Sequence, residues 1–279
     1  MQAAGITRAQ LMQQEAIPVA EAKPKRDYVS GEPFLPADEL KTVGTQMHRF
    51  QEWYMKASAT ERDTIGAKIY SLDYFHKHDD YLWIPFKDVF DLYQLDALNV
   101  SMVTAWVMRF KGPKKNNYKH VAFMEPRQIN TPMVQAQAHS INNSILTFLA
   151  QNNHKDSIYL PYNKSLINIV SRYIYSFHWV LFAFGVSHST VLVFDSMDHE
   201  DIFFIEINVD KQQTGTNLCG YYVFDYLHLA PRQFFYDFRY MDLSGKKPCD
   251  DMLRAVQEQL MGFINEQILD PAGEFYVGD

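Results

Sequence analysis

The sequence predicts an α+β fold, with helices filling the first half of the chain and strands gathering in the second. Apolar residues recur at helical spacing in four stretches. Short apolar, β-branched or aromatic runs lie between these stretches, and most of them come late in the chain. Because helices and strands are segregated instead of alternating, the pattern favours α+β over a parallel βαβ sheet.

Each predicted element follows from its apolar positions. Helices are expected around residues 45–54, 103–110, 134–148 and 253–264. Strands are expected at residues 81–86, 121–124, 157–160, 178–184, 190–194 and 202–209. The strand at 178–184 is apolar on both faces, which predicts a central and rigid place in the sheet. We expect three regions along the chain: a flexible tail at 1–32, a helical lead-in at 33–80 and one domain at 81–279.

Composition limits the classes of function. The chain has 279 residues and is 47% hydrophobic, which is enough to build a core. Its 26 basic and 33 acidic residues give a net charge of −7, so a nucleic-acid-binding surface is disfavoured. No window reaches the roughly 18 uninterrupted apolar residues of a membrane helix. With two cysteines and no secretory signal, we expect an intracellular protein, nuclear or cytoplasmic.

A predicted hairpin brings a histidine and a carboxylate together. If the insert at 185–189 closes it, facing residues have numbers that sum to about 373. Val180 then faces Val193, and His178 faces Asp195 to within one residue. A carboxylate in that place would fix the ring tautomer and stabilise the imidazolium. A purely structural contact at the rim of the sheet is the alternative.

A cysteine follows this hairpin at the start of a further helical run. Asn217 is predicted to cap that helix, which puts Cys219 in its first turn. Free amides and the helix dipole stabilise a thiolate there, and a thiolate is a nucleophile. Gly220 permits close approach of backbone or substrate. The alternative is that Cys219 is only a small hydrophobic residue buried in the core.

Together these motifs resemble the Ulp-type cysteine proteases, which act on ubiquitin-like modifiers such as SUMO. The matching pieces, in chain order, are His178-Trp179, Asp195-Ser196, Gln212 and Cys219-Gly220. Residues 98–106, 158–163 and 256–275 also look like this family, nearest to its plant, transposon-derived branch. The resemblance spans residues 30 to 279 and implies a papain-like (adenain/Ulp-type) fold with a helical N-terminal lead-in.

By this resemblance Cys219 is the nucleophile, His178 the general base and Asp195 the residue that orients it. The implied reaction is cleavage after the C-terminal glycine of a modifier, in processing or deconjugation. It requires no metal and no organic cofactor. The implied partners are the modifier and its conjugates, with no membrane and no nucleic acid.

The resemblance also implies substrate contacts and an oxyanion donor. Trp179 and Gly220 are expected at the modifier's C-terminus. Counting from Gly215 selects Gln212 as the donor, whereas counting six residues back from the cysteine selects Gln213. We predict Gln212.

Two departures from the family pattern keep other functions open. Residues 164–177 form an extra segment before His178, a true insertion or a gene-model artefact, and the stretch from Asp195 to Cys219 is short. A misplacement of about 1 Å can cost about a hundredfold in rate. A catalytically degenerate module that binds a ubiquitin-like modifier is therefore the alternative. A DNA-binding protein and a metal site at His76 and His78 are weaker interpretations.

Overall fold

A computed structural model describes residues 26–69, 80–111, 118–164, 178–185, 189–197, 205–206, 208–213, 216–229, 242–243 and 250–278. Its helices are α2 (Ala37–Leu40), α3 (Thr45–Ser58), α4 (Phe86–Tyr93), α5 (Val100–Lys111), α6 (Thr131–Gln151), α7 (Cys219–Leu229) and α8 (Asp250–Phe263), which continues into the π-helix η5 (Ile264–Leu269). Its strands are β1 (Thr64–Ile69), β2 (Asp80–Pro85), β3 (Val121–Phe123), β4 (Ser157–Asn163), β5 (Trp179–Gly185), β6 (Thr190–Phe194), β7 (Ile205–Glu206), β8 (Asn208–Val209) and β9 (Asp242–Leu243). The predicted α+β class is confirmed.

The four predicted helices are present, and so are the first five predicted strands. The expected strand at 202–209 is instead divided between β7 and β8, which belong to different sheets. Sequence reasoning missed β1 and α4. Helix α4 begins directly after Pro85, within one apolar run that also contains β2. The change from strand to helical spacing of the apolar residues was therefore not visible in the sequence.

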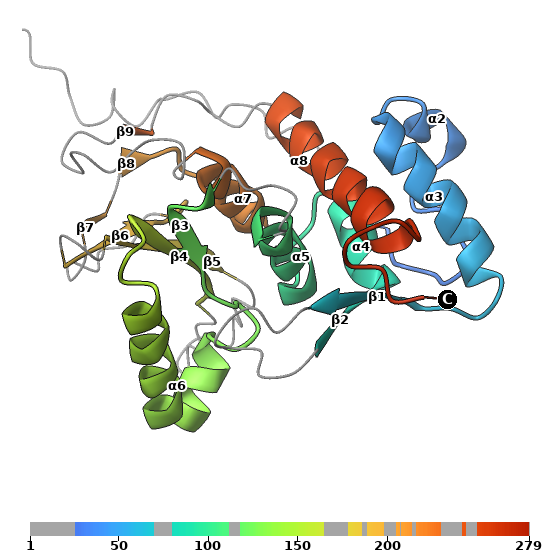
Figure 1. Cartoon of the computed structure of the whole chain (residues 1–279). Helices are drawn as coiled ribbons and strands as arrows, with labels where there is room; N and C mark the ends of the chain where they lie inside the picture. The colour runs from blue at the N-terminus through green and yellow to red at the C-terminus, as the bar shows by residue number, and fades with distance from the viewer. Residues whose placement is uncertain are drawn as a thin grey trace, which may run out of the picture.

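The largest sheet has the strand order β3-β4-β5-β6-β7. Strand β5 lies in the middle and pairs antiparallel with β4 and β6, which confirms its predicted central place. Helices cover both faces of this sheet (Figure 1). Ile141 and Phe148 of α6 pack on one face in a small cluster with Ile158 and Leu160 of β4. Helices α5 and α7 contribute to the main core on the other face.

The predicted hairpin register is wrong by two residues. Val193 pairs with Phe182 and not with Val180. The ladder continues to Gly185 and Thr190, so only four residues remain for the loop. The prediction gave ladder positions to the loop because the insert contains no Asn-Gly or Asp-Gly pair to mark a tight turn.

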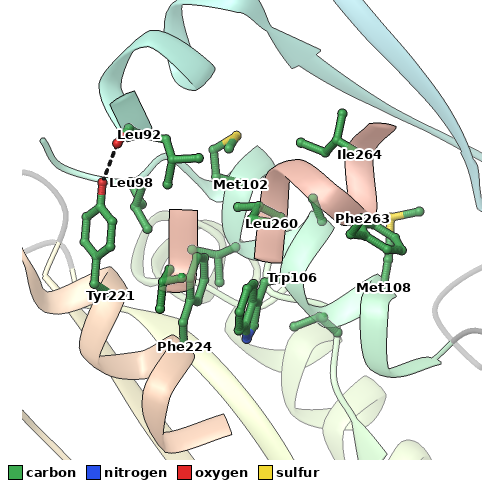
Figure 2. Close-up of a cluster of buried hydrophobic side chains, with 14 of the residues drawn as sticks. Leu92, Leu98, Met102, Trp106, Met108, Tyr221, Phe224, Leu260, Phe263 and Ile264 are labelled. Carbon is green, nitrogen blue, oxygen red and sulfur yellow. Dashed lines mark hydrogen bonds between the residues drawn. The ribbon is translucent and has the colours of Figure 1, made fainter. Parts of the chain in front are cut away.

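The main core joins helices α3, α4, α5, α7 and α8 to strands β1, β2 and β5, and Figure 2 shows the part of it where α5, α7 and α8 meet. Trp106 of α5 stacks on Phe224 of α7, with ring centroids 4.5 Å apart and an interplanar angle of 7°. The Tyr221 hydroxyl donates to the Leu92 carbonyl over 3.2 Å, which ties α7 to the end of α4. Both aromatic rings of the stack are fully buried, so α7 packs on α5 through a well-packed apolar contact.

The segment predicted as a helical lead-in, 33–80, shares this core. Phe34, Phe50 and Tyr54 belong to the same buried cluster as the residues of α5, α7 and α8. The segment also contains β1, which pairs with β2. In Figure 1, α3 lies alongside α8. Among the described residues, no helix has the length and apolar character needed to cross a bilayer.

The start of α3 is capped by a residue distant in sequence. Gly44 stands at the N-cap and offers no side chain. Glu258 of α8 fills this role, because its two carboxylate oxygens accept from the backbone amides of Gln46 at 2.7 Å and Met47 at 3.3 Å. A Cβ at position 44 would lie 2.2 Å from Glu258 Oε2, so glycine leaves room for the carboxylate.

Replacing Glu258 with alanine is expected to lower the free energy of unfolding by about 1–2 kcal/mol, the usual loss when a helix cap is removed. Urea unfolding followed by circular dichroism measures it. The matched control is Glu52→Ala, an exposed glutamate on α3 itself, which is expected to change little. Equal effects of the two substitutions would contradict the capping role.

Candidate active site

Three elements of the fold each deliver one residue of the predicted triad. His178 directly precedes β5, Asp195 directly follows β6, and Cys219 is the first residue of α7. Helix α7 packs on β5, which brings the cysteine to the end of the sheet that carries the other two residues. All three side chains are buried.

The imidazole and the carboxylate meet as diagonal neighbours. In the observed register, the ladder position across from Asp195 is Val180, and His178 lies two residues further along. Diagonal side chains in an antiparallel pair remain within reach of one another. His178 Nε2 and Asp195 Oδ1 are 2.8 Å apart. The predicted contact is therefore present, although the predicted register is not.

The surroundings of His178 favour its protonated form. Burial lowers its pKa, but the hydrogen bonds that the ring makes to Asp195 and Cys219, and the charges of both groups, outweigh burial and raise the pKa from 6.5 to about 9. Since Nε2 is hydrogen-bonded to Asp195, Nδ1 is the ring nitrogen that remains for proton exchange with the thiol. This orientation suits an imidazolium between a carboxylate and a thiolate.

The sulfur of Cys219 lies at the start of its helix. The backbone amide of Trp179 donates to Cys219 Sγ over 3.4 Å. The Leu218 carbonyl accepts from the amides of Tyr221 and Tyr222, so α7 begins directly after Leu218. The prediction that Asn217 caps this helix is wrong by one residue, because Leu218 stands at the N-cap position. The Asn217 Nδ2 atom donates to Asp96 Oδ1 at 2.9 Å. A thiolate at Cys219 still gains from the helix dipole and from the donated amide.

The two residues predicted to contact substrate both pack against Leu98. Trp179 is fully buried, and its indole Nε1 donates to the Leu98 carbonyl over 2.8 Å. A Cβ at Gly220 would lie 3.0 Å from Leu98 Cβ, so glycine lets α7 approach this segment closely. Leu98 thus supports the site, a role that the sequence signalled only through the motif at 98–106. Substrate contact by Trp179 and Gly220 stays a prediction.

The predicted oxyanion donor, Gln212, is half-buried in the loop before α7. Its Nε2 atom donates to the Thr216 carbonyl at 3.4 Å. Gln213 is exposed, and its own carbonyl accepts from the Thr216 amide and hydroxyl. The described contacts bring neither side-chain amide to Cys219, so the role of Gln212 stays a prediction.

The described residues contain no group of three or more His, Cys, Asp or Glu that could hold a metal ion. His76 and His78, the weaker candidates for such a site, lie outside the described residues, as do residues 165–177 of the extra segment before His178.

The predicted papain-like arrangement is present: a cysteine begins a helix, and that helix packs on a sheet carrying histidine and aspartate. No family model matches the sequence, and no curated protein matches it. Several solved structures are similar. One is the Ulp1 protease domain in complex with Smt3, the yeast ortholog of SUMO, with 12% identity, a TM-score of 0.46 and coverage of 83% of this chain and 96% of that chain.

Two further similar structures are proteases acting on SUMO. The SUMO protease Ulp1 with its catalytic cysteine oxidised to a sulfenic acid has 14% identity and a TM-score of 0.44, covering 85% of this chain and 98% of that one. A de-sumoylating protease has 13% identity and a TM-score of 0.43, covering 72% and 93%. The arrangement of His178, Asp195 and Cys219 comes from contacts within this chain, and their catalytic roles stay predictions.

Proposed function

We propose that this protein is a cysteine-type peptidase that cleaves after the C-terminal glycine of a ubiquitin-like modifier, in SUMO-type processing or deconjugation. One observation supports the chemistry most strongly: His178, bonded to Asp195 at 2.8 Å, also interacts with Cys219, which stands at the start of a helix. The modifier class follows from the sequence motifs around His178-Trp179 and Cys219-Gly220.

The proposed reaction is acyl transfer through the sulfur. The Cys219 thiolate attacks the glycine carbonyl carbon, forming a C–S bond and a tetrahedral oxyanion. The Cys219 backbone amide and the Gln212 side chain are the proposed oxyanion donors, each worth roughly 3 to 4 kcal/mol in comparable enzymes. His178 Nδ1 gives its proton to the departing amine as the C–N bond breaks. Water, deprotonated by His178, then hydrolyses the thioester and regenerates the thiol.

A SUMO probe with a thiol-reactive group in place of its C-terminal carboxylate tests this proposal. The wild-type protein is expected to form a covalent adduct, and Cys219→Ala to form none, because Cys219 carries the sulfur that interacts with the His178 imidazole. Gel shift and peptide mass spectrometry measure the adduct and its site. Cleavage of a fluorogenic SUMO conjugate is expected to fall by at least about 10⁴-fold in Cys219→Ala, as when other covalent nucleophiles are removed.

The matched control is Cys249→Ala, which removes the second of the two cysteines and is expected to retain both capture and cleavage. Ubiquitin and related modifiers, presented as the same probes, establish the class. Capture that persists in Cys219→Ala, or that never occurs with any modifier, contradicts the peptidase.

The second candidate, a non-catalytic module that binds a ubiquitin-like modifier, is favoured by the closure of the site. Cys219 is only 4% exposed and Trp179 has no exposed surface. A substrate's C-terminus would have to open a path to the sulfur. Saturable binding of unmodified SUMO, together with absence of covalent capture, would favour this module over the enzyme.

A further inference from the structure

The turn that carries Asp195 is held by a lysine outside the triad. Lys211 Nζ donates to the carbonyl of Asp195 at 3.1 Å and to that of Met197 at 3.2 Å. The next residue, Gln212, donates its backbone amide to the Ser196 carbonyl at 2.8 Å. All three carbonyls of the turn therefore accept from two consecutive residues of one strand-like segment.

The same segment is fastened to the helix of the nucleophile. The Tyr222 hydroxyl donates to the Lys211 carbonyl at 3.3 Å, and the Tyr226 hydroxyl donates to the Asp210 carbonyl at 3.2 Å. These tyrosines lie four residues apart on α7 and are both buried, so they form one polar stripe on that helix. Residues 210–212 thus connect the acid of the triad to the element that begins with Cys219.

We propose that Lys211 is a positioning residue of the catalytic triad, which holds the 195–197 turn so that the Asp195 carboxylate stays on His178 Nε2. The inference deepens the proposed function and rests on it. Asp195 Oδ1 also accepts from the Met197 amide at 2.8 Å, so the direction of the carboxylate depends on the turn remaining closed. A lysine ammonium has three donors and can satisfy two carbonyls at once, whereas a methionine side chain of similar length has no donor.

A variant that removes no charge separates positioning from simple electrostatics. The charged and titratable groups that interact with His178 are Asp195, at the end of β6, and Cys219, on α7. The Lys211 ammonium is hydrogen-bonded to the backbone carbonyl of Asp195. If Lys211 acted only as a nearby positive charge, its removal would favour the imidazolium but disfavour the thiolate, and Tyr222→Phe, which removes no charge, would leave the ion pair unchanged. If it holds Asp195 in place, its removal weakens the ion pair and leaves a more ordinary thiol.

Alkylation of Cys219 by 2-chloroacetamide, followed between about pH 5 and 10, reads out the thiolate without any modifier. Peptide mass spectrometry distinguishes Cys219 from Cys249. For Lys211→Met we expect alkylation of Cys219 at pH 7 to slow roughly tenfold or more, because fewer molecules carry the ion pair. Lys211→Arg, which keeps a charged donor, is expected to remain near the wild-type profile.

Two further variants sharpen the test. Lys155→Met is the matched control, because Lys155 is also half-buried and donates to a backbone carbonyl, that of Lys119, away from the site. Tyr222→Phe removes only the hydroxyl that holds the Lys211 carbonyl, and it is expected to shift the profile in the same direction by a smaller amount. It supplies the answer if Lys211→Met fails to fold.

The outcomes are distinct from those for the proposed function. A Lys211→Met profile that superimposes on the wild type, or that moves toward more thiolate at neutral pH, overturns the positioning role. A wild-type protein whose Cys219 is alkylated at pH 7 no faster than free cysteine overturns it as well. A wild-type protein with an activated Cys219 that nevertheless cleaves no modifier overturns the peptidase and leaves the role of Lys211 standing.

Discussion

Asp195→Asn is expected to lower kcat/KM for a SUMO conjugate by roughly 10²- to 10⁴-fold, as when a triad loses its orienting acid. The asparagine keeps the size of the side chain, but it removes the negative charge that faces the imidazole at 2.8 Å. It also allows an amide nitrogen to face the ring, which favours the wrong tautomer. Because Asp195 is buried, solvent does not replace the lost charge.

The same substitution is expected to move the alkaline limit of activity. In the wild type, the His178 pKa of about 9 keeps the ring protonated at neutral pH, and the proton donor is lost as the pH rises through that value. Without the hydrogen bond and charge of Asp195, the pKa of His178 falls toward 6.5. The alkaline limb of the pH–activity profile, where activity declines, therefore shifts to lower pH. A pH profile of kcat/KM measures both. An unchanged limb would show that Asp195 does not set the protonation of His178.

Stability should change with pH in the same sense. A raised pKa in the folded state means that the contribution of His178 is fully present below pH 6.5 and is lost as the pH rises through about 9. The difference in melting temperature between the wild type and Asp195→Asn is therefore expected to shrink across that range. Asp156→Asn, at an exposed position before β4, serves as the control and should show no such dependence.

Trp106→Ala is expected to give the largest loss of stability, about 3–5 kcal/mol in the free energy of unfolding. Trp106 is fully buried and stacks face to face on Phe224 of the cysteine helix (Figure 2). Its removal leaves a cavity directly beneath α7, at the centre of the main core. Urea unfolding followed by circular dichroism measures the change.

A second tryptophan provides the matched control. Trp83 on β2 is 58% exposed, and its replacement by alanine is expected to cost less than about 1 kcal/mol, as is usual for surface positions. Both variants lose the same side chain, so the difference reports burial alone. Similar losses at the two positions would contradict the assignment of Trp106 to the core.

The sequence predicted most elements because their apolar periods are strong and local. It also predicted the His178–Asp195 contact, and that prediction tolerated the error in register because a diagonal neighbour is still within reach. The register itself depends on where the ladder ends, and the loop has no turn residues that fix this. The spacing of apolar residues along one strand carries little information on which residue of the next strand lies opposite.

The remaining features of the site depend on partners distant in the chain. Asn217 has the chemistry of a helix cap, but Asp96, 121 residues away, binds its amide. Lys211 resembles any surface lysine in sequence, and only the fold brings its ammonium to the turn at Asp195. Trp179 and Gly220 both contact Leu98, likewise only because the fold brings these segments together. Local propensity cannot reveal contacts that tertiary packing creates.

The pairing of α3 with α8 has a consequence for biosynthesis. The Glu258 carboxylate accepts from the backbone amide of Gln46, 212 residues earlier, and the Phe275 carbonyl accepts from the amide of Lys68 in β1. Closing loops of this length carries a large entropic cost, and contacts of such high sequence separation form late. The side of α3 that packs on α8 therefore stays uncovered until α8 has left the ribosome. We expect nascent chains that stall before residue 250 to be held by chaperones and to be readily degraded.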